Sequence, residues 1–322
     1  MTWTKSAAKP LIFFLLAVVA FAIFVHFRAL SRENAAEARW PMQGQLVDVD
    51  GIKVHAVVEG SGPDLVLIHG SSGNTRDFTF SLSAKLAKSF RVIIFDRPGL
   101  GYTETFNPSG ETIFEQAALL ANAAAQLGAQ KPLVLGQSYG GAVALAWAVE
   151  RPDATAGLIL VSSPSQVWPG PLSRFYRVTS SWLGQKLAIP LMTAFVPNAY
   201  IEDSIAAVFA PATPPEGYSD YIAAGLTARR VSLAANARHR GNLKGEIAQL
   251  VPLYETIKTP VELIHAPDDT TVPLEIHAVP LAGLIEGANL TLTPGAGHMP
   301  HHLAQPALID AIERAATRAG LR

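Results

Sequence analysis

The sequence predicts an α/β protein in which helices cover both faces of a mostly parallel sheet, preceded by an N-terminal transmembrane helix. Two observations predict this: an uncharged apolar run near the start of the chain, and apolar segments that alternate with helical ones afterwards. Such alternation is typical of a parallel sheet, because parallel neighbours need a crossover between them. Hydrophobic residues make up 49% of the 322 residues, enough for a large core.

The apolar run covers residues 11–27 and has no charge; Lys5 and Lys9 precede it. Its length is at the short end of the roughly 17–25 residues that span a bilayer as a helix. We therefore expect residues 1–28 to be an uncleaved, single-pass anchor through which the protein contacts the membrane.

Two alternatives to the anchor stay open: a cleaved signal peptide and a buried core helix. An Ala-x-Ala pattern occurs at 36–38, but it lies well past the apolar run, with Arg28 and Arg32 between. Basic residues flank the run on both sides, so charge gives little indication of orientation. The short basic N-terminal tail slightly favours a body outside the cytoplasm.

The strands of the sheet are predicted from short apolar segments, which are typical of strands buried on both faces. A hairpin at Asp50-Gly51 joins two further strands, 45–50 and 52–59, ahead of them. The apolar segments are Leu65–Ile68, Arg91–Phe95, Leu133–Leu135, Leu158–Val161, Val261–Ile264 and Leu290–Leu292. Helical segments are expected around 78–88, 111–127, 139–150, 274–285 and 303–318.

Two segments interrupt this alternation. Residues 29–44 have the composition of a polar linker. Residues 165–257 contain no convincing buried strand and read as helical pieces inserted before the penultimate strand. The α/β core is therefore expected in two parts, 45–164 and 258–322.

The strongest chemical signal is Gly136-Gln137-Ser138-Tyr139-Gly140-Gly141, between a predicted strand and a predicted helix. A serine on such a tight turn needs small neighbours, and the turn exposes its hydroxyl beside a helix N-terminus, which favours developing negative charge. A plain glycine turn would give the same letters, but the strand–turn–helix context favours Ser138 as a nucleophile.

A serine nucleophile needs a base and an orienting carboxylate, which the later strand ends can supply. His298 lies in a glycine-lined loop after the last strand, whereas His301 and His302 read as residues at a helix end. Asp268 and Asp269 both follow the strand before, and the residues alone leave the choice of acid open. A helix N-cap is the alternative role for these acids.

An oxyanion formed at Ser138 would need backbone N–H donors. Tyr139, the residue after the serine, offers one, and Ser71, after His69-Gly70 at another strand end, offers a second. A glycine turn that merely joins a strand to a helix is the alternative reading of this loop.

The ordered set of these motifs resembles the α/β-hydrolase superfamily over about residues 45–318. The set is His69-Gly70, Asp96-Arg97-Pro98-Gly99-Leu100-Gly101, Gly136–Gly141, Asp269 with Val272-Pro273, and Gly297-His298. The resemblance implies the α/β-hydrolase fold, a catalytic triad of Ser138, Asp269 and His298, and a mainly structural role for Asp96. It selects Asp269 over Asp268, which lies one residue out of register with Val272-Pro273. It also implies that 165–257 is a helical cap over the site.

The resemblance leaves the bond that is cleaved open. We expect an ester-like bond, cleaved through an acyl-enzyme as in carboxylesterases and lipases. Hydrolysis of a C–C bond, perhydrolysis of the haloperoxidase type and a catalytically silent binding module are alternatives. Epoxide hydrolases and haloalkane dehalogenases resemble the same frame but use an aspartate nucleophile, which Ser138 disfavours.

Composition limits the partners. A net charge of −1 without runs of like charge argues against nucleic acid, and the absence of cysteine excludes disulfides and thiolate metal sites. Nothing in the sequence suggests a metal or an organic cofactor. The aromatic residues of the cap favour a small apolar substrate, although they would equally pack the cap onto the core. The oligomeric state stays open.

Overall fold

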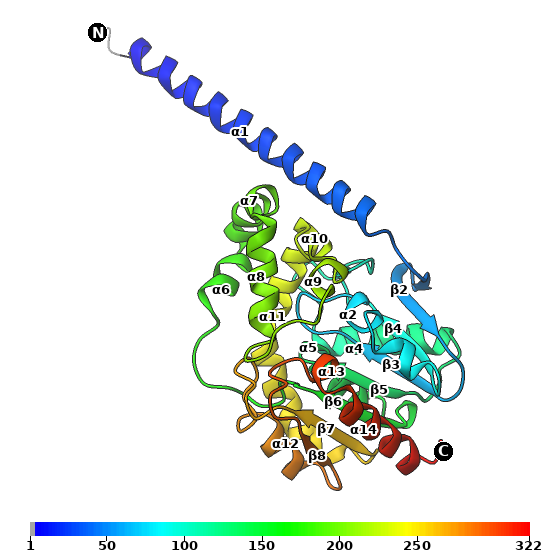
Figure 1. The fold of residues 1–322 in the computed structure, drawn as a ribbon. Helices are drawn as coiled ribbons and strands as arrows, with labels where there is room; N and C mark the ends of the chain where they lie inside the picture. The colour runs from blue at the N-terminus through cyan, green and yellow to red at the C-terminus, as the bar shows by residue number, and fades with distance from the viewer. Residues whose placement is uncertain (1–3) are drawn as a thin grey trace.

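The computed structural model describes residues 4–322, apart from the side chains of residues 4–8 and Asn198. Lys5, one of the two basic residues expected before the span, therefore lies outside the described side chains. Figure 1 shows a rounded body from which one long helix, α1 (Thr4–Arg39), projects. The body is a layered α/β structure with a group of helices on the side of α1.

The body is built on an eight-stranded sheet with the order β1-β2-β4-β3-β5-β6-β7-β8 in the described chain. β1 pairs antiparallel with β2 and β2 with β4, and all later pairs are parallel. The strands are β1 (Gln45–Val49), β2 (Ile52–Glu59), β3 (Asp64–Ile68), β4 (Arg91–Phe95), β5 (Leu133–Gln137), β6 (Gly157–Val161), β7 (Val261–His265) and β8 (Asn289–Leu292). The predicted fold class is confirmed.

Two cores form because alternate residues of each buried strand point to opposite faces. Val66 and Ile68 pack with α4 (Ile113–Gln126) and α5 (Tyr139–Glu150) on one face. Leu65 and Leu67 pack on the other face with side chains of α3 (Ser83–Leu86) and α14 (Gln305–Arg318).

The helix expected around 78–88 is instead two short ones, α2 (Arg76–Thr79) and α3. The remaining core helices are η1 (Pro152–Ala154), α12 (Ala278–Leu284) and α13 (Pro300–Leu303).

Between β6 and β7, the described residues form helices and loops and no strand. The helices are α6 (Arg174–Thr179), η2 (Gly184–Ala188), α7 (Ile189–Phe195), α8 (Asn198–Val208), α9 (Tyr218–Tyr221), α10 (Ala224–Thr227), α11 (Arg230–Leu250) and η3 (Val251–Thr256). We call residues 165–257 the cap, and its limits stay a prediction. The C-terminal half of α11 packs into the main core through Leu243, Ile247 and Leu250.

α1 extends further than the sequence indicated. It continues to Arg39, through most of the segment for which a linker was expected. That stretch is rich in alanine and glutamate, which favour a helix, and the cap supplies partners for its acids. Glu33 pairs with Arg230 at 2.6 Å and Glu37 with Arg229 at 2.8 Å.

α1 is also the one described helix that is long and apolar enough to cross a membrane. Its most apolar 18-residue window within Lys9–Arg39 has a mean hydropathy of 2.6 and is almost wholly exposed. A signal sequence near the N-terminus would meet the same criteria of length and composition.

A buried acid, Glu246, lies where α11 meets the core. Its Oε2 accepts a hydrogen bond from the Ile113 amide at 3.2 Å, at the start of α4. Its Oε1 has no hydrogen-bond partner within residues 4–322. Burial therefore raises the pKa of Glu246 from 4.5 to about 7.

We expect Glu246→Gln to stabilise the protein at pH 8 and to change little at pH 5. Because the pKa is raised on folding, the favourable contribution of Glu246 is complete below its unfolded pKa and is lost as the pH rises through about 7. An amide does not ionise, so the gain at pH 8 is at most about 3 kcal/mol. Thermal unfolding at both pH values measures it, with Glu275→Gln on the surface as the control. Equal shifts at both pH values would contradict this account.

Candidate active site

Ser138 lies at the turn between β5 and α5 with a strained backbone. Its φ is 50° and its ψ is −122°, a conformation that residues other than glycine rarely adopt. The Ser138 amide donates to the carbonyl of Val161 at 2.8 Å, which fixes the turn against β6. The side chain thus lies at the carboxyl edge of the parallel strands, where ligands bind in such folds.

The glycines around Ser138 are required by close backbone contacts. A Cβ on Gly136 would come within 2.2 Å of the Gly140 carbonyl oxygen, and one on Gly140 within 2.1 Å of the Ile68 oxygen. A Cβ on Gly141 would meet the Ser163 hydroxyl at 1.8 Å. The small residues of this motif therefore allow α5 to begin directly behind the serine.

Ser138, His298 and Asp269 form one chain of hydrogen bonds. The Ser138 Oγ lies 2.9 Å from His298 Nε2, and His298 Nδ1 lies 2.8 Å from Asp269 Oδ2. All three residues are buried. The amides of Thr271 and Val272 each donate to Asp269 Oδ1 at 2.9 Å. Burial would raise the pKa of Asp269, but the hydrogen bond and charge of His298 outweigh it and hold that pKa below its usual value.

Asp268 has a different partner, the loop that carries the histidine. Its Oδ1 accepts from the Gly295 amide at 3.0 Å and its Oδ2 from the Gly297 amide at 3.3 Å. The adjacent acids therefore point in different directions: Asp269 contacts the imidazole, and Asp268 holds the backbone next to it.

The loop after β3 packs directly against the serine. A Cβ on Gly70 would lie 3.0 Å from the Ser138 Cβ and 2.2 Å from the Gln137 amide oxygen. Within the described part of the chain, neither the Ser71 nor the Tyr139 amide donates a hydrogen bond to the protein. Both amides therefore remain available to a ligand.

A buried arginine fixes this loop. Arg97 donates from Nε to the His69 carbonyl at 3.0 Å and from Nη2 to the Gly70 carbonyl at 2.9 Å. The Arg97 amide in turn donates to His69 Nε2 at 3.0 Å, so the His69 proton is assigned to Nδ1. Burial, with Arg97 nearby, lowers the pKa of His69 to about 4, so this histidine is neutral at pH 7. The role of His69 is therefore structural.

The Asp96 carboxylate holds the neighbouring turn, as expected for a structural residue. Its Oδ1 accepts from the Thr75 amide at 2.7 Å and its Oδ2 from the Tyr102 amide at 2.8 Å. His55 Nδ1 lies 2.5 Å from the same Oδ2.

The cap contacts the loop from the other side. Asn236 of α11 accepts from the Ser72 amide and donates to the Ser72 hydroxyl, both at 2.9 Å. The Thr227 hydroxyl donates to the Ser72 carbonyl at 2.7 Å. Ser138 is only 6% exposed beneath the cap. A cavity of about 290 Å³ lies instead between α1 and the cap, and no residue of the Ser138–His298–Asp269 chain lines it.

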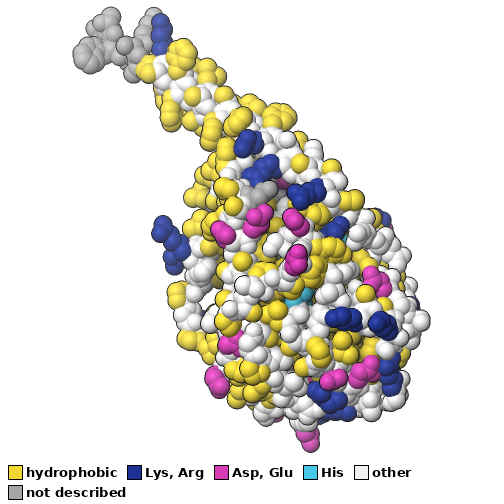
Figure 2. Space-filling model, in the orientation of Figure 1, with side chains coloured by type: hydrophobic (Ala, Val, Ile, Leu, Met, Phe, Trp, Pro, Cys, Tyr) yellow, Lys and Arg dark blue, Asp and Glu magenta, His cyan; other side chains and the backbone are white. Residues whose placement is uncertain are grey.

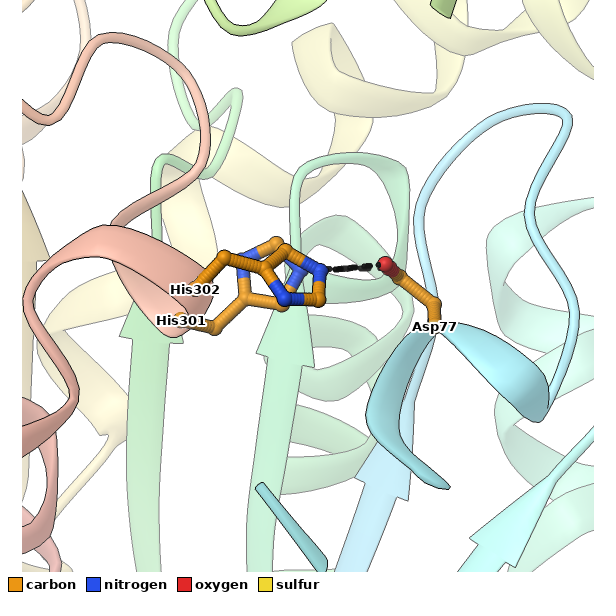
Figure 3. A group of neighbouring side chains, drawn as sticks. All are labelled: Asp77, His301 and His302. Carbon is orange, nitrogen blue, oxygen red and sulfur yellow. Dashed lines mark hydrogen bonds and ion pairs between the residues drawn. The ribbon is translucent and has the colours of Figure 1, made fainter. Parts of the chain in front are cut away.

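A second buried cluster lies next to the histidine loop. Figure 3 shows His301 and His302 of α13 side by side, with their imidazoles directed toward Asp77 of α2. His301 Nε2 lies 3.2 Å from Asp77 Oδ2, and His302 Nε2 lies 2.8 Å from Oδ1. The Tyr218 hydroxyl of the cap also donates to Asp77 Oδ1, at 2.7 Å. The cluster thus ties α2, α13 and the cap together.

Asp77, His301 and His302 bring three potential metal ligands within 4.8 Å of one another. A histidine that binds a metal through Nε2 carries its proton on Nδ1 and normally donates it to an acceptor. Neither Nδ1 has such a partner within the described residues. Burial lowers the pKa of His301 to about 4, against the opposing effect of Asp77, which leaves a neutral ring that can donate from Nε2. The geometry therefore fits a carboxylate that accepts three hydrogen bonds better than it fits a metal centre.

The residues predicted from sequence thus come together, and several supporting ones were missed. Asp77, Asn236 and Tyr218 contact partners far away in the sequence, and no local motif marks them. Asp268 was weakly indicated as a site residue by the sequence, because it neighbours Asp269 on the same loop.

Comparison with known proteins shows the family to which the chain belongs. The chain matches the alpha/beta hydrolase family over residues 65–311. Haloalkane dehalogenase 2 of Mycobacterium tuberculosis is 32% identical over 146 residues, which are 44% of this chain and 50% of that protein. The chain thus aligns with only about half the length of this relative. The 2-hydroxymuconate semialdehyde hydrolase of a Pseudomonas species is 27% identical over 265 residues, 80% of this chain and 88% of that protein.

Solved structures agree in fold. A thermophilic esterase from Thermogutta terrifontis, 22% identical, superposes with a TM-score of 0.69 over 85% of this chain and 99% of its own. A bacterial membrane phospholipase A, 19% identical, superposes with a TM-score of 0.64 over 97% of this chain and 99% of its own. The sheet order, the strained serine turn and the family match together show that the chain belongs to the α/β hydrolase family.

Proposed function

We propose that the protein is a membrane-anchored serine hydrolase that cleaves an ester-like bond through an acyl-enzyme. The observation that carries this proposal is the hydrogen-bonded chain from Ser138 through His298 to Asp269. A hydroxyl, an imidazole and a carboxylate in this order convert a poor nucleophile into an effective one near neutral pH.

In this mechanism the Ser138 Oγ attacks the substrate carbonyl carbon while His298 Nε2 takes the hydroxyl proton. Asp269, kept ionised by its low pKa, accepts the hydrogen bond from Nδ1–H and stabilises the imidazolium. His298 then returns the proton to the leaving alcohol, which leaves an acyl group on Ser138. Water attacks the acyl carbonyl with His298 again as the base, and the carboxylic acid product departs.

The negative oxygen of each tetrahedral intermediate would be bound by the Ser71 and Tyr139 amides. The Tyr139 amide lies in the first turn of α5, where the helix dipole adds to the stabilisation. Arg97 and Asn236 position the Ser71 side of this hole through the carbonyls of residues 69–70 and through Ser72.

Hydrolysis of a C–C bond is the second candidate. The resemblance to 2-hydroxymuconate semialdehyde hydrolase over 80% of this chain favours it. The same triad would serve, since a C–C hydrolase also needs a base and an oxyanion hole. Dehalogenation is disfavoured, because a serine stands where an aspartate nucleophile would be needed. A screen of the purified protein with p-nitrophenyl esters and with vinylogous diketones would separate the two candidates.

A fluorophosphonate probe should label Ser138 covalently, because the hydroxyl is activated by His298. Peptide mapping by mass spectrometry checks this. Ser138→Ala should abolish labelling, and His298→Ala should lower turnover by several orders of magnitude. His301→Ala and His302→Ala should leave per-site turnover nearly unchanged and lower the melting temperature, because they remove donors to Asp77. Labelling that persists in Ser138→Ala would reject the assignment.

Asp269→Asn should lower kcat by about 10⁴ in a protein that still folds, because an amide favours the wrong histidine tautomer. Asp268→Asn is the matched control. It keeps one oxygen for the amides of the histidine loop and should retain most activity. Both are compared with one ester substrate, alongside melting temperatures. If Asp268→Asn is the more damaging at equal stability, the acid has been assigned wrongly.

The intact protein should stay in the membrane fraction after a high-salt wash, because α1 would be held by hydrophobic burial rather than by charge. Immunoblotting of the washed fractions and N-terminal sequencing give the measurement. Release by salt alone, or a mature N-terminus near Ala38, would show that residues 1–28 are not a retained anchor.

A further inference from the structure

The anchor helix is fixed to the cap along the second half of its length. The rings of Phe21 and Phe24 lie 6.5 and 6.2 Å from that of Phe195, at the end of α7. Arg28 donates to the Ala194 carbonyl at 2.8 Å, and its guanidinium lies 5.2 Å from the centre of the Phe195 ring. The cap is therefore held at a defined position along the axis of α1.

At this position, the end of α7 lies close to the end of the apolar run of α1. Phe24 precedes Phe27, the last residue of the run, by about 4.5 Å along a helix that rises 1.5 Å per residue. If residues 11–27 cross the hydrocarbon layer, Phe195 lies near its boundary with the headgroups. The helical stretch 182–195, which ends at Phe195, then reaches this boundary at its C-terminal end.

That stretch exposes an apolar stripe. Its large side chains recur every four residues, close to one helical turn, and are unusually exposed for their type. Trp182 is 73% exposed and Leu187 is 60% exposed. The stripe consists of Trp182, Leu183, Leu187, Leu191 and Phe195, and Phe175 and Val178 of α6 lie exposed beside it. Figure 2 shows apolar side chains continuing from α1 onto the neighbouring surface of the body.

The charged residues of the chain segment that carries the stripe have one sign, and the acidic Glu202 and Asp203 of α8 follow directly after it. Between residues 165 and 201 the chain contains Arg174, Arg177 and Lys186 and no acidic residue. All three basic side chains are exposed. Apolar residues flanked by basic ones are typical of helices that lie in the interface of an anionic bilayer. A two-fold contact with a second copy would instead bring like charges together.

We propose that the stripe of residues 182–195 docks into the headgroup layer of the bilayer that α1 spans. This inference rests on the anchor of the proposed function. The cap then touches lipid at one end and the loop beside Ser138 at the other, through Asn236. The docked cap therefore faces the bilayer, and we expect the substrate to be an amphiphilic ester drawn from it.

The absence of native cysteine allows a direct test in the full-length protein. Leu187→Cys and Leu191→Cys each receive a nitroxide label, and Leu292→Cys is the matched control. Leu292 is a 50% exposed leucine on β8, at the opposite end of the body from α1. Each variant is reconstituted into phosphatidylcholine–phosphatidylglycerol vesicles, and fluorophosphonate labelling of Ser138 verifies the fold.

Power-saturation spectroscopy then compares collisions with oxygen, which concentrates in lipid, and with a neutral nickel chelate, which stays in water. Labels at 187 and 191 should shift toward oxygen and away from nickel, whereas the label at 292 should favour nickel. Nickel access at 187 and 191 equal to that at 292 would overturn the proposal. Protection from both reagents, with dipolar coupling between identical labels, would identify a second copy as the occupant and overturn it too.

Failure of the anchor has a separate signature. Vesicle flotation of the unlabelled protein reports membrane attachment by α1 and the stripe together, so a chain that does not float refutes the anchor and with it the docking. A chain that floats with water-accessible labels refutes the docking and leaves the anchored hydrolase standing.

Discussion

The strained backbone at Ser138 is the constraint on which the rest of this site depends. A serine held at φ 50° costs of order 1–3 kcal/mol, so the surroundings must enforce it. They do so through three glycines that let β5, β3 and α5 approach closely, and through the Ser138 amide bonded to β6. The result is a hydroxyl at the carboxyl edge of the sheet, within reach of the loops that follow β3, β7 and β8.

Each of those loops takes part in polar contacts that fix its position. Arg97 fixes the loop after β3, Asp268 fixes the histidine loop, and Asp77 ties the following helix α13 to α2 and the cap. Networks of hydrogen bonds between side chains and loops rigidify their surroundings. The cap takes part through Asn236 and Tyr218, so a change in cap position would be felt at the Ser71 amide. We therefore see the cap as part of the site rather than a cover over it.

The sheet and the Ser138–His298–Asp269 set were predictable because their signals are local. Apolar runs mark buried strands, and the glycine pattern around Ser138 reflects close contacts at that turn. The choice of Asp269 over Asp268 needed family register, since two adjacent acids look alike in sequence; their different partners appear only in the fold. Asp77 with His301 and His302 was not predictable, because the contact joins residues more than 220 positions apart. The extension of α1 to Arg39 depends likewise on distant partners in the cap.

The central claim, an acyl group carried by Ser138, is tested most directly by rapid-quench mass spectrometry during turnover of a p-nitrophenyl ester. The nitrophenolate is a good leaving group, so acylation should outrun deacylation and the intermediate should accumulate. The account predicts an acyl mass on the peptide that contains Ser138, rising and then decaying as substrate is consumed. An acyl mass on any other residue, or the same adduct in Ser138→Ala, would contradict it.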